Sequence, residues 1–315
     1  MRQETGLLSN PCLQTHPACQ QNLRGCRPTL DHRPLGFFLT MSIFHLLCGI
    51  LLITTSLQVK EYKVRYDNLC KGTGDQITVK FDNAELSGMI YLYYELHGFY
   101  QAHFRFVSSF SADQMQGRYV ESTENCDPVN DYSANGGLPM PCGLLPTYFF
   151  NDYYEPDQSG FEESGIVWKN EIDDLFKPPN SQYSNQQRWM RGISDQFPNE
   201  TQNEHFIAWM RVAHQPTFRK LFMKANTTIK PNLNVRVFCN YDKEKFDGER
   251  WLVILKPSGM GGNNIVLAII NFVVFAVLLV FALIFKTECC CINRKRHPQG
   301  FEKETLVIEE NVLTK

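Results

Sequence analysis

The longest apolar run of the chain lies close to its C-terminal end. Residues 265–285 read IVLAIINFVVFAVLLVFALIF, and Asn271 is the only strongly polar residue among them. A helix of this length rises about 31 Å, close to the hydrocarbon thickness of a bilayer. A helix in a soluble domain would carry a polar face, which this run lacks. The pattern therefore predicts a membrane-spanning helix over residues 265–285.

A second apolar stretch, residues 35–57, is interrupted only by His45 and by several serines and threonines. A cleaved signal peptide is the alternative interpretation, because Thr54 and Ser56 form a weak small-x-small site. The polar, Pro-rich tail of residues 1–34 and the length of the stretch favour an uncleaved anchor. We therefore expect a first membrane-spanning helix over residues 35–57.

Flanking charge predicts the orientation of the two spans. Basic residues lie next to both of them on the outer sides: Arg24, Arg27, Arg33, Lys286, Arg294, Lys295 and Arg296. Positive loops stay in the cytoplasm, so the tails 1–34 and 286–315 are predicted to be cytoplasmic. Residues 58–264 then form one lumenal or extracellular domain, since a segment of this length translocates largely regardless of its charge.

Four stretches of this domain have the pattern of β-strands. Apolar and polar positions alternate over residues 76–81 and 233–241, while residues 89–96 and 251–255 are rich in β-forming side chains.

Two other stretches have helical spacing. They are residues 99–110 and residues 205–213, the second of which Pro216 ends or kinks. Residues 125–199 are rich in Pro, Gly, Asn and Asp, which indicates long ordered excursions from a β scaffold. The predicted fold class is an α+β membrane protein, with two transmembrane helices flanking one large β-sheet-based domain.

Composition limits the function. The net charge is −2, from 31 basic and 33 acidic residues, so nothing indicates a nucleic-acid partner. The 11 cysteines fall into three groups. Cys12, Cys19 and Cys26 are spaced seven apart, a poor match to zinc ligands. Four cysteines lie in the middle domain (Cys70, Cys126, Cys142 and Cys239), and an even number fits disulfides if this domain is lumenal.

Two kinds of covalent modification are candidates. N-glycosylation sequons occur at Asn199 and Asn226, which agrees with a lumenal middle domain. Cys289, Cys290 and Cys291 follow the second span beside a basic patch. They are either S-palmitoylation sites or free thiols.

No specific catalytic pattern is present. The sequence has no His-Glu-x-x-His, Gly-x-Ser-x-Gly or P-loop segment, and it lacks the Asp-Lys-Thr-Gly segment of ion and lipid pumps. The acidic pairs Glu162-Glu163 and Asp173-Asp174 are most simply explained as solvated loop charges rather than as a glycosidase pair. We therefore expect a protein that is not an enzyme and that needs no cofactor or metal.

Several stretches resemble one family in order and spacing: Tyr91–Gln101 with His103 and Arg105, Pro141–Leu144, Phe150–Asp152, Gly165–Trp168 and Met260–Asn264. Residues 204–211 and 216–221 resemble its most recognisable helix. The family is the CDC-fifty (Lem) family, of the transmembrane protein thirty type. Its members are accessory β-subunits of type-IV P-type ATPases, the phospholipid flippases.

The resemblance implies a chaperone and co-subunit that forms a heterodimer with the ATPase α-subunit. Such a subunit would permit export of the pump from the endoplasmic reticulum and would support translocation of aminophospholipids to the cytoplasmic leaflet. It would be found in the endoplasmic reticulum, the Golgi and secretory vesicles, and the plasma membrane, in contact with membrane lipids. The competing hypothesis is a glycosylated receptor or adhesion protein without a pump partner.

The resemblance also implies a Cys126–Cys142 disulfide. For Cys70 and Cys239, a second bridge and two free thiols remain equally open. Departures from the family pattern, such as Ile265 where a Pro is usual, indicate a divergent paralogue.

Two further expectations concern contacts. The aromatic segment 148–154 either supplies anchors for the pump or fills the core. Ala268 and Ala276 are small residues that would admit close approach of a neighbouring helix.

Overall fold

The computed structural model describes residues 33–295, except residues 83, 122–123, 131–137, 230 and 243, and it leaves the side chains of Arg33, of Glu124 and of residues 287–295 undescribed. The chain separates into two compact units. One, here called the helix pair, consists of the described residues up to 53 and from 264 onward. The other, here called the sheet domain, comprises residues 54–263.

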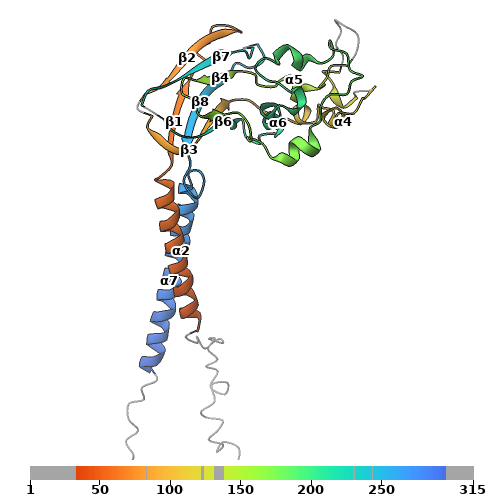
Figure 1. Ribbon diagram of the computed structural model, residues 1–315. Helices are drawn as coiled ribbons and strands as arrows, with labels where there is room; N and C mark the ends of the chain where they lie inside the picture. Colours follow the sequence, from red (N-terminus) through yellow and green to blue (C-terminus); the bar gives the residue numbers. More distant parts are fainter. Residues whose placement is uncertain are drawn as a thin grey trace, which may run out of the picture. The chain divides into compact units, whose positions relative to one another are not determined.

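The helix pair is made of α2 (Arg33–Ser56) and α7 (Ile265–Lys295) (Figure 1). Both helices are long and apolar enough to cross a membrane, over Pro34–Ser56 and Ile265–Lys286. The predicted architecture, two apolar helices flanking a sheet-rich middle domain, is confirmed.

Aromatic and small side chains join the two helices. The ring of Phe38 stacks on Phe281 and Phe285, with centroids 5.8 and 5.2 Å apart. A Cβ atom at Gly49 would lie 2.9 Å from the Phe272 ring, so only glycine admits that ring at this position. Ala268 is buried, whereas Ala276 is exposed. Of the two alanines, only Ala276 is therefore open to a further helix.

The sheet domain contains two antiparallel sheets. The five-stranded sheet has the order β1 (Lys60–Arg65), β8 (Glu249–Lys256), β3 (Leu86–His97), β6 (Thr217–Ile229) and β5 (Phe161–Glu162). The three-stranded sheet has the order β2 (Asp75–Phe81), β7 (Leu233–Cys239) and β4 (Tyr153–Pro156). The four strands predicted from the sequence are present as β2, β3, β7 and β8.

Short helices fill the excursions between these strands (Figure 1). They are α3 (Phe104–Val107), α4 (Ala112–Met115), η1 (Glu124–Cys126), α5 (Leu144–Thr147), η2 (Glu171–Leu175), η3 (Trp189–Ile193), η4 (Glu200–Gln202) and α6 (Glu204–Met210). The core contains side chains of both sheets and of α6. Tyr154 of β4 packs edge-on against Phe222 of β6, with ring centroids 4.8 Å apart, and Trp209 of α6 is fully buried.

Two helical expectations are wrong in extent or kind. Of residues 99–110, only Phe104–Val107 form a helix, because buried Gln101 instead bonds to Trp209 O at 3.4 Å and accepts from Ala213 N at 2.9 Å. Residues 216–221 are not helical. They begin strand β6, which pairs with β3 along its whole length.

Candidate functional site

One carboxylate of the acidic pair Glu162-Glu163 makes hydrogen bonds with neighbouring elements. Glu163 accepts hydrogen bonds from the Tyr153 hydroxyl at 2.5 Å and from His205 Nε2 at 3.1 Å. Among the described residues, no three or more His, Cys, Asp or Glu side chains cluster in a way that would hold a metal ion. The arrangement around Glu163 therefore serves to join β4, β5 and α6.

The Phe150–Asp152 segment places a carboxylate in the core. Asp152 accepts from the Tyr66 hydroxyl at 2.9 Å, from Tyr241 N at 2.8 Å and from Arg250 Nη1 at 3.3 Å. Burial raises the pKa of the Asp152 carboxyl against the opposing effect of Arg250 and the hydrogen bonds. This buried cluster ties the ends of β1, β7 and β8 to the start of β4 and is structural.

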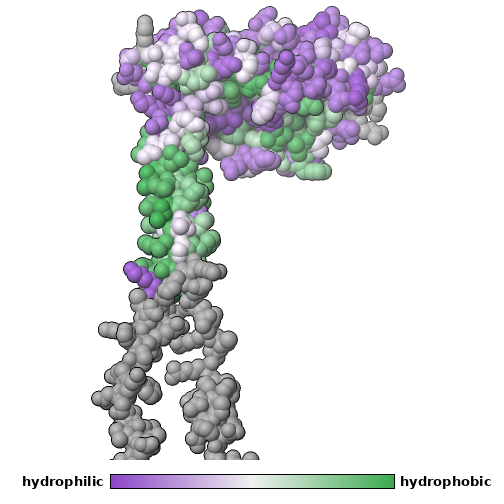
Figure 2. Space-filling model, turned by 60° about the horizontal axis from the view of Figure 1, so that its bottom comes forward, coloured by the Kyte–Doolittle hydropathy of each residue, from purple (hydrophilic) through white to green (hydrophobic). Residues whose placement is uncertain are grey.

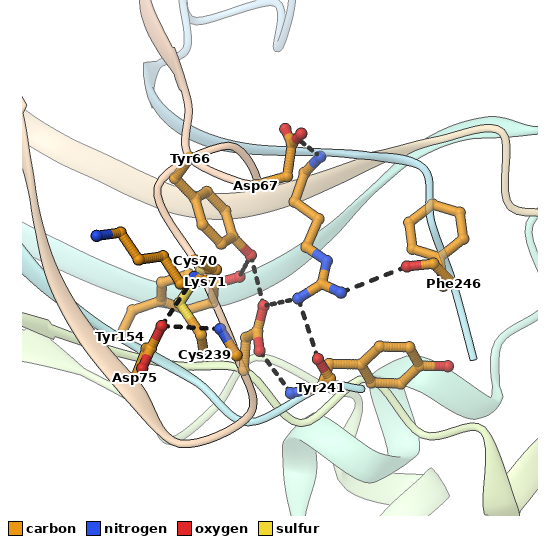
Figure 3. The surroundings of a disulfide bond; sticks show 12 residues. Tyr66, Asp67, Cys70, Lys71, Asp75, Tyr154, Cys239, Tyr241 and Phe246 are labelled. Atoms are coloured by element: carbon orange, nitrogen blue, oxygen red, sulfur yellow. Dashed lines mark hydrogen bonds and ion pairs between the residues drawn. A yellow bond between two sulfur atoms is a disulfide. The ribbon is translucent and has the colours of Figure 1, made fainter. Parts of the chain in front are cut away.

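Two disulfides lie in the sheet domain. Cys70 is bonded to Cys239 at the end of β7, beside Tyr66 and Tyr154 (Figure 3). Cys126 is bonded to Cys142. The Cys70–Cys239 bridge joins the two cysteines for which the sequence left a disulfide and free thiols equally open.

The Pro141–Leu144 segment is shaped by a tight backbone contact. Gly143 has φ +102°, and a Cβ atom there would lie 2.2 Å from Ser109 O. The backbone N–H of Cys142 donates to Gln114 Oε1 at 2.8 Å, and that of Leu144 donates to Ser109 Oγ at 2.9 Å. Glycine is therefore required after Cys142, which explains this part of the resemblance physically.

The aromatic segment 148–154 fills the core. Phe149, Phe150 and Tyr154 are buried, and Tyr148 and Tyr153 pack against the same core. Of the two interpretations left open by the sequence, the structure favours core packing. Exposed aromatic rings of the sheet domain lie elsewhere.

Two other family segments meet at one carboxylate. Glu204, the first residue of α6, accepts backbone N–H groups from Gly165 at 3.0 Å, Ile166 at 2.7 Å and Val167 at 3.3 Å. Asn203 caps the same helix by accepting from His205 N and Phe206 N. The loop that ends at Trp168 is thus fastened to a capped helix.

Trp168 itself is 71% exposed. Its backbone N–H donates to Glu171 Oε2 at 3.0 Å, and Glu171 forms an ion pair with Arg211 just beyond α6. The hydrogen bonds from Arg211 lower the pKa of the Glu171 carboxyl, which stays ionised at neutral pH. The backbone that presents this exposed ring is therefore already held in place, so ordering it on binding would cost little entropy.

An apolar groove of about 300 Å³ lies next to this loop. Leu175, which is 50% exposed, lines it together with Phe110, Met115, Ile207, Met210 and the Glu171–Arg211 pair. We call Trp168, Leu175 and this groove the Trp168 surface. Figure 2 shows apolar side chains, in green, gathered on one face of the sheet domain among polar ones.

Sequence reasoning missed the Trp168 surface. In the sequence, Trp168 belongs to a family segment, and no apolar periodicity surrounds it. The usable signal was that a tryptophan stands in a Gly-containing loop between charged residues. The sequence predicts no helix or strand that would cover this ring.

The candidate modification sites have different surroundings. Asn199 and Asn226 are both exposed, the first with a left-handed backbone before η4 and the second on β6. The backbone of Cys289, Cys290 and Cys291 belongs to α7, but their side chains lie outside what the structure describes.

Comparison with known proteins gives one consistent result. The model of the LEM3 (ligand-effect modulator 3) family / CDC50 family matches residues 51–295. ALA-interacting subunit 3 of Arabidopsis thaliana is 31% identical over 84% of this chain and 83% of its own. Cell cycle control protein 50C of Macaca fascicularis is 28% identical over 75% and 81%, and Cell cycle control protein 50A of Bos taurus is 28% identical over 83% and 86%.

Proposed function

The chain belongs to the LEM3/CDC50 family, and on this premise we propose that it is a non-catalytic accessory subunit of a type-IV P-type ATPase, a phospholipid flippase. The relatives named ALA-interacting subunits are, by that name, subunits that bind another protein. Together with the two apolar helices, this supports a membrane protein whose task is to associate with a pump.

The proposal extends to what the subunit does for the pump. It permits export of the α-subunit from the endoplasmic reticulum and supports translocation of aminophospholipids to the cytoplasmic leaflet. Both termini are cytoplasmic, and the complex travels through the Golgi and secretory vesicles to the plasma membrane. A subunit without chemistry of its own acts through differential contacts, because the pump state that it binds more tightly becomes more populated.

The observation that carries the proposal is the Trp168 surface. Large aromatic rings dominate the energetics of protein interfaces, and a loop whose backbone is already held in place loses little entropy on binding. The Glu204 and Glu171 carboxylates hold the backbone beside Trp168, while the adjoining groove is apolar. This combination is suited to docking on an exoplasmic loop of the pump.

Affinity capture tests the proposal. The full chain is co-expressed with each member of a panel of type-IV ATPase α-subunits and purified in mild detergent. We expect at least one α-subunit to be retained and to leave the endoplasmic reticulum only with the chain. Trp168→Ala should lower capture about 30-fold, equivalent to about 2 kcal/mol.

The matched control is Phe104→Ala, because Phe104 is 79% exposed and does not line the groove. An equal loss with both variants would show that the Trp168 surface is not the specific anchor. If no α-subunit is retained by the wild-type chain, the proposed function is wrong.

The modification sites belong to the same proposal. We propose that Asn199 and Asn226 carry N-glycans acquired in the secretory pathway, where the Cys126–Cys142 and Cys70–Cys239 disulfides also form. Palmitoylation of Cys289, Cys290 and Cys291 would place acyl chains at the cytoplasmic end of α7. The glycan assignments are tested by comparing the change in electrophoretic mobility on glycosidase treatment between the wild type and the variants Asn199→Gln and Asn226→Gln. Acyl exchange on the three cysteines tests the palmitoylation.

A further inference from the structure

A polar contact joins the two helices of the helix pair. His45 Nδ1 of α2 lies 2.9 Å from Asn271 Oδ1 of α7. The Asn271 amide also donates from Nδ2 to Leu267 O, one turn earlier in its own helix, at 2.8 Å. This second bond fixes the orientation of the amide, because only the nitrogen can donate to a carbonyl.

The fixed amide determines the tautomer of the histidine. Asn271 Oδ1 is only an acceptor, so His45 must carry a proton on Nδ1 to make the bond. In the neutral ring, Nε2 then has a lone pair and no proton. Nε2 makes no hydrogen bond with any described residue, and it is not among the fully buried side-chain atoms that lack a partner. Since His45 is half-buried, Nε2 is an accessible acceptor without a partner among the described residues.

The depth of this nitrogen makes its lack of a partner costly. His45 lies at the middle of the span Pro34–Ser56. At about 1.5 Å per residue it is roughly 16 Å from either end, near the midplane of the hydrocarbon core. Neither water nor lipid headgroups supply hydrogen-bond donors at that depth, and polar groups within spans mark functional contacts.

We propose that His45 Nε2 accepts a hydrogen bond from a hydroxyl or amide donor on a transmembrane helix of the ATPase α-subunit. This inference rests on the proposed function and assigns a specificity contact within it. His45 precedes residues 51–295, which match the family model, whereas its partner Asn271 lies within them. The contact would discriminate between α-subunits that do and do not carry a donor at this depth.

The surrounding face admits a helix. Ser42 and Gly49 share a face of α2 with half-buried His45 and are buried in the helix pair, whereas Phe44 and Leu47, on the adjoining face of α2, are 56% and 61% exposed. A helix that docks on this face covers apolar side chains while it supplies the donor. A second copy of this chain would offer its own His45 only as an acceptor, which does not pair with Nε2.

The experiment uses the full chain co-expressed with the α-subunit panel. His45→Asn keeps an amide N–H for Asn271 but has no atom at the position of Nε2. His45→Gln instead carries its amide at the outer position. Thr40→Val is the matched control, because exposed Thr40 already donates to Phe37 O in its own helix at 2.9 Å. The captured fraction is measured at equal chain levels, with size-exclusion profile and glycan state as checks of folding.

For at least one α-subunit that the wild type captures, we expect His45→Asn to lower the captured fraction about threefold to tenfold, the range for one intramembrane hydrogen bond. His45→Gln should recover most of it, and Thr40→Val should match the wild type. The inference is overturned if His45→Asn captures every α-subunit as the wild type does. It is also overturned if Thr40→Val loses as much, or if His45→Asn reduces only self-association of the chain. Failure of the proposed function itself is visible separately, as absence of capture by the wild type.

Discussion

Two aromatic-containing segments of the sheet domain differ in what they do with their rings. Residues 148–154 place theirs in the core, where Phe150 packs against Tyr94 and Tyr241 with ring centroids 4.8 and 4.9 Å apart. Residues 165–175 leave Trp168 in solvent although the backbone beside it is held by carboxylates. Aromatic content therefore does not identify an interface. What matters is whether neighbouring strands supply side chains to cover the ring.

The largest effect is expected in the buried segment. Phe150→Ala removes a ring from the core and should lower the free energy of unfolding by about 3–5 kcal/mol. Thermal unfolding of the purified full chain, with Trp168→Ala as the exposed counterpart, measures the difference. A loss for Phe150→Ala no larger than that for Trp168→Ala would abolish the contrast between the two segments.

The next largest effect concerns a disulfide that closes the loop shortly before the buried segment. The Cys126–Cys142 bridge closes a sequence separation of 16 residues, and in the loop-entropy model its loss costs about 3 kcal/mol. Cys142→Ser should therefore destabilise the sheet domain and retain the chain in the endoplasmic reticulum. Cys48→Ser, at a free cysteine in α2, is the control. Unchanged glycan maturation in Cys142→Ser would count against the bridge.

A smaller effect is expected where the exposed segment is fastened. Glu204→Gln removes the charge that accepts three backbone N–H groups, so we expect a loss of about 1–2 kcal/mol. Hydrogen exchange of residues 165–167 should accelerate. Glu155→Gln, at an exposed pair with Arg236, should leave both measurements unchanged. Unaltered exchange in Glu204→Gln would mean that other contacts hold the loop.

The two segments are linked through Glu163, which provides a pH test. Burial raises the pKa of Glu163, but hydrogen bonds from His205 and Tyr153 outweigh it, and the net pKa lies below the usual 4.5. Between the folded-state pKa and 4.5, the Glu163 carboxyl is protonated more in the unfolded chain than in the folded one. Its contribution to the free energy of unfolding is therefore complete above about pH 4.5, and it is lost as the pH falls through the folded-state pKa.

Glu163→Gln should therefore lower the free energy of unfolding by less than about 1 kcal/mol at pH 7, since the partly exposed carboxylate is screened. The difference from wild type should shrink below pH 4.5 in unfolding curves taken at several pH values. Glu162→Gln, at the exposed neighbour, serves as the control. A difference that is the same at pH 7 and pH 3 would remove Glu163 from this role.

The smallest effect on stability is expected at Trp168. Its ring covers little of the core, so Trp168→Ala should change the free energy of unfolding by no more than about 0.5 kcal/mol. The same substitution is expected to have a large effect only on capture of the α-subunit. If Trp168→Ala unfolds readily, the ring stabilises the fold and is not a free binding residue.

Strand β6 illustrates why part of the fold could not be predicted. Its inward positions include Phe218, Lys220 and Phe222, and the lysine breaks the apolar alternation that identified other strands. In the structure, Lys220 Nζ donates to Arg211 O, and burial together with the charge of Arg211 lowers the Lys220 pKa to about 7. Only a tertiary acceptor makes a buried lysine tolerable, and hydrophobic patterning contains no information about it.

By itself, the sequence determined the two apolar spans, the four strands whose periodicity is regular, and the family segments that brought a flippase partner into consideration. These are local properties, since length, alternation and short spacing are all contained in neighbouring residues. The tertiary structure decided that residues 148–154 are core, that Trp168 is exposed, and that His45 meets Asn271 from 226 positions away. Those outcomes depend on which distant side chains fill the space around a residue, and that is settled only when the chain has folded.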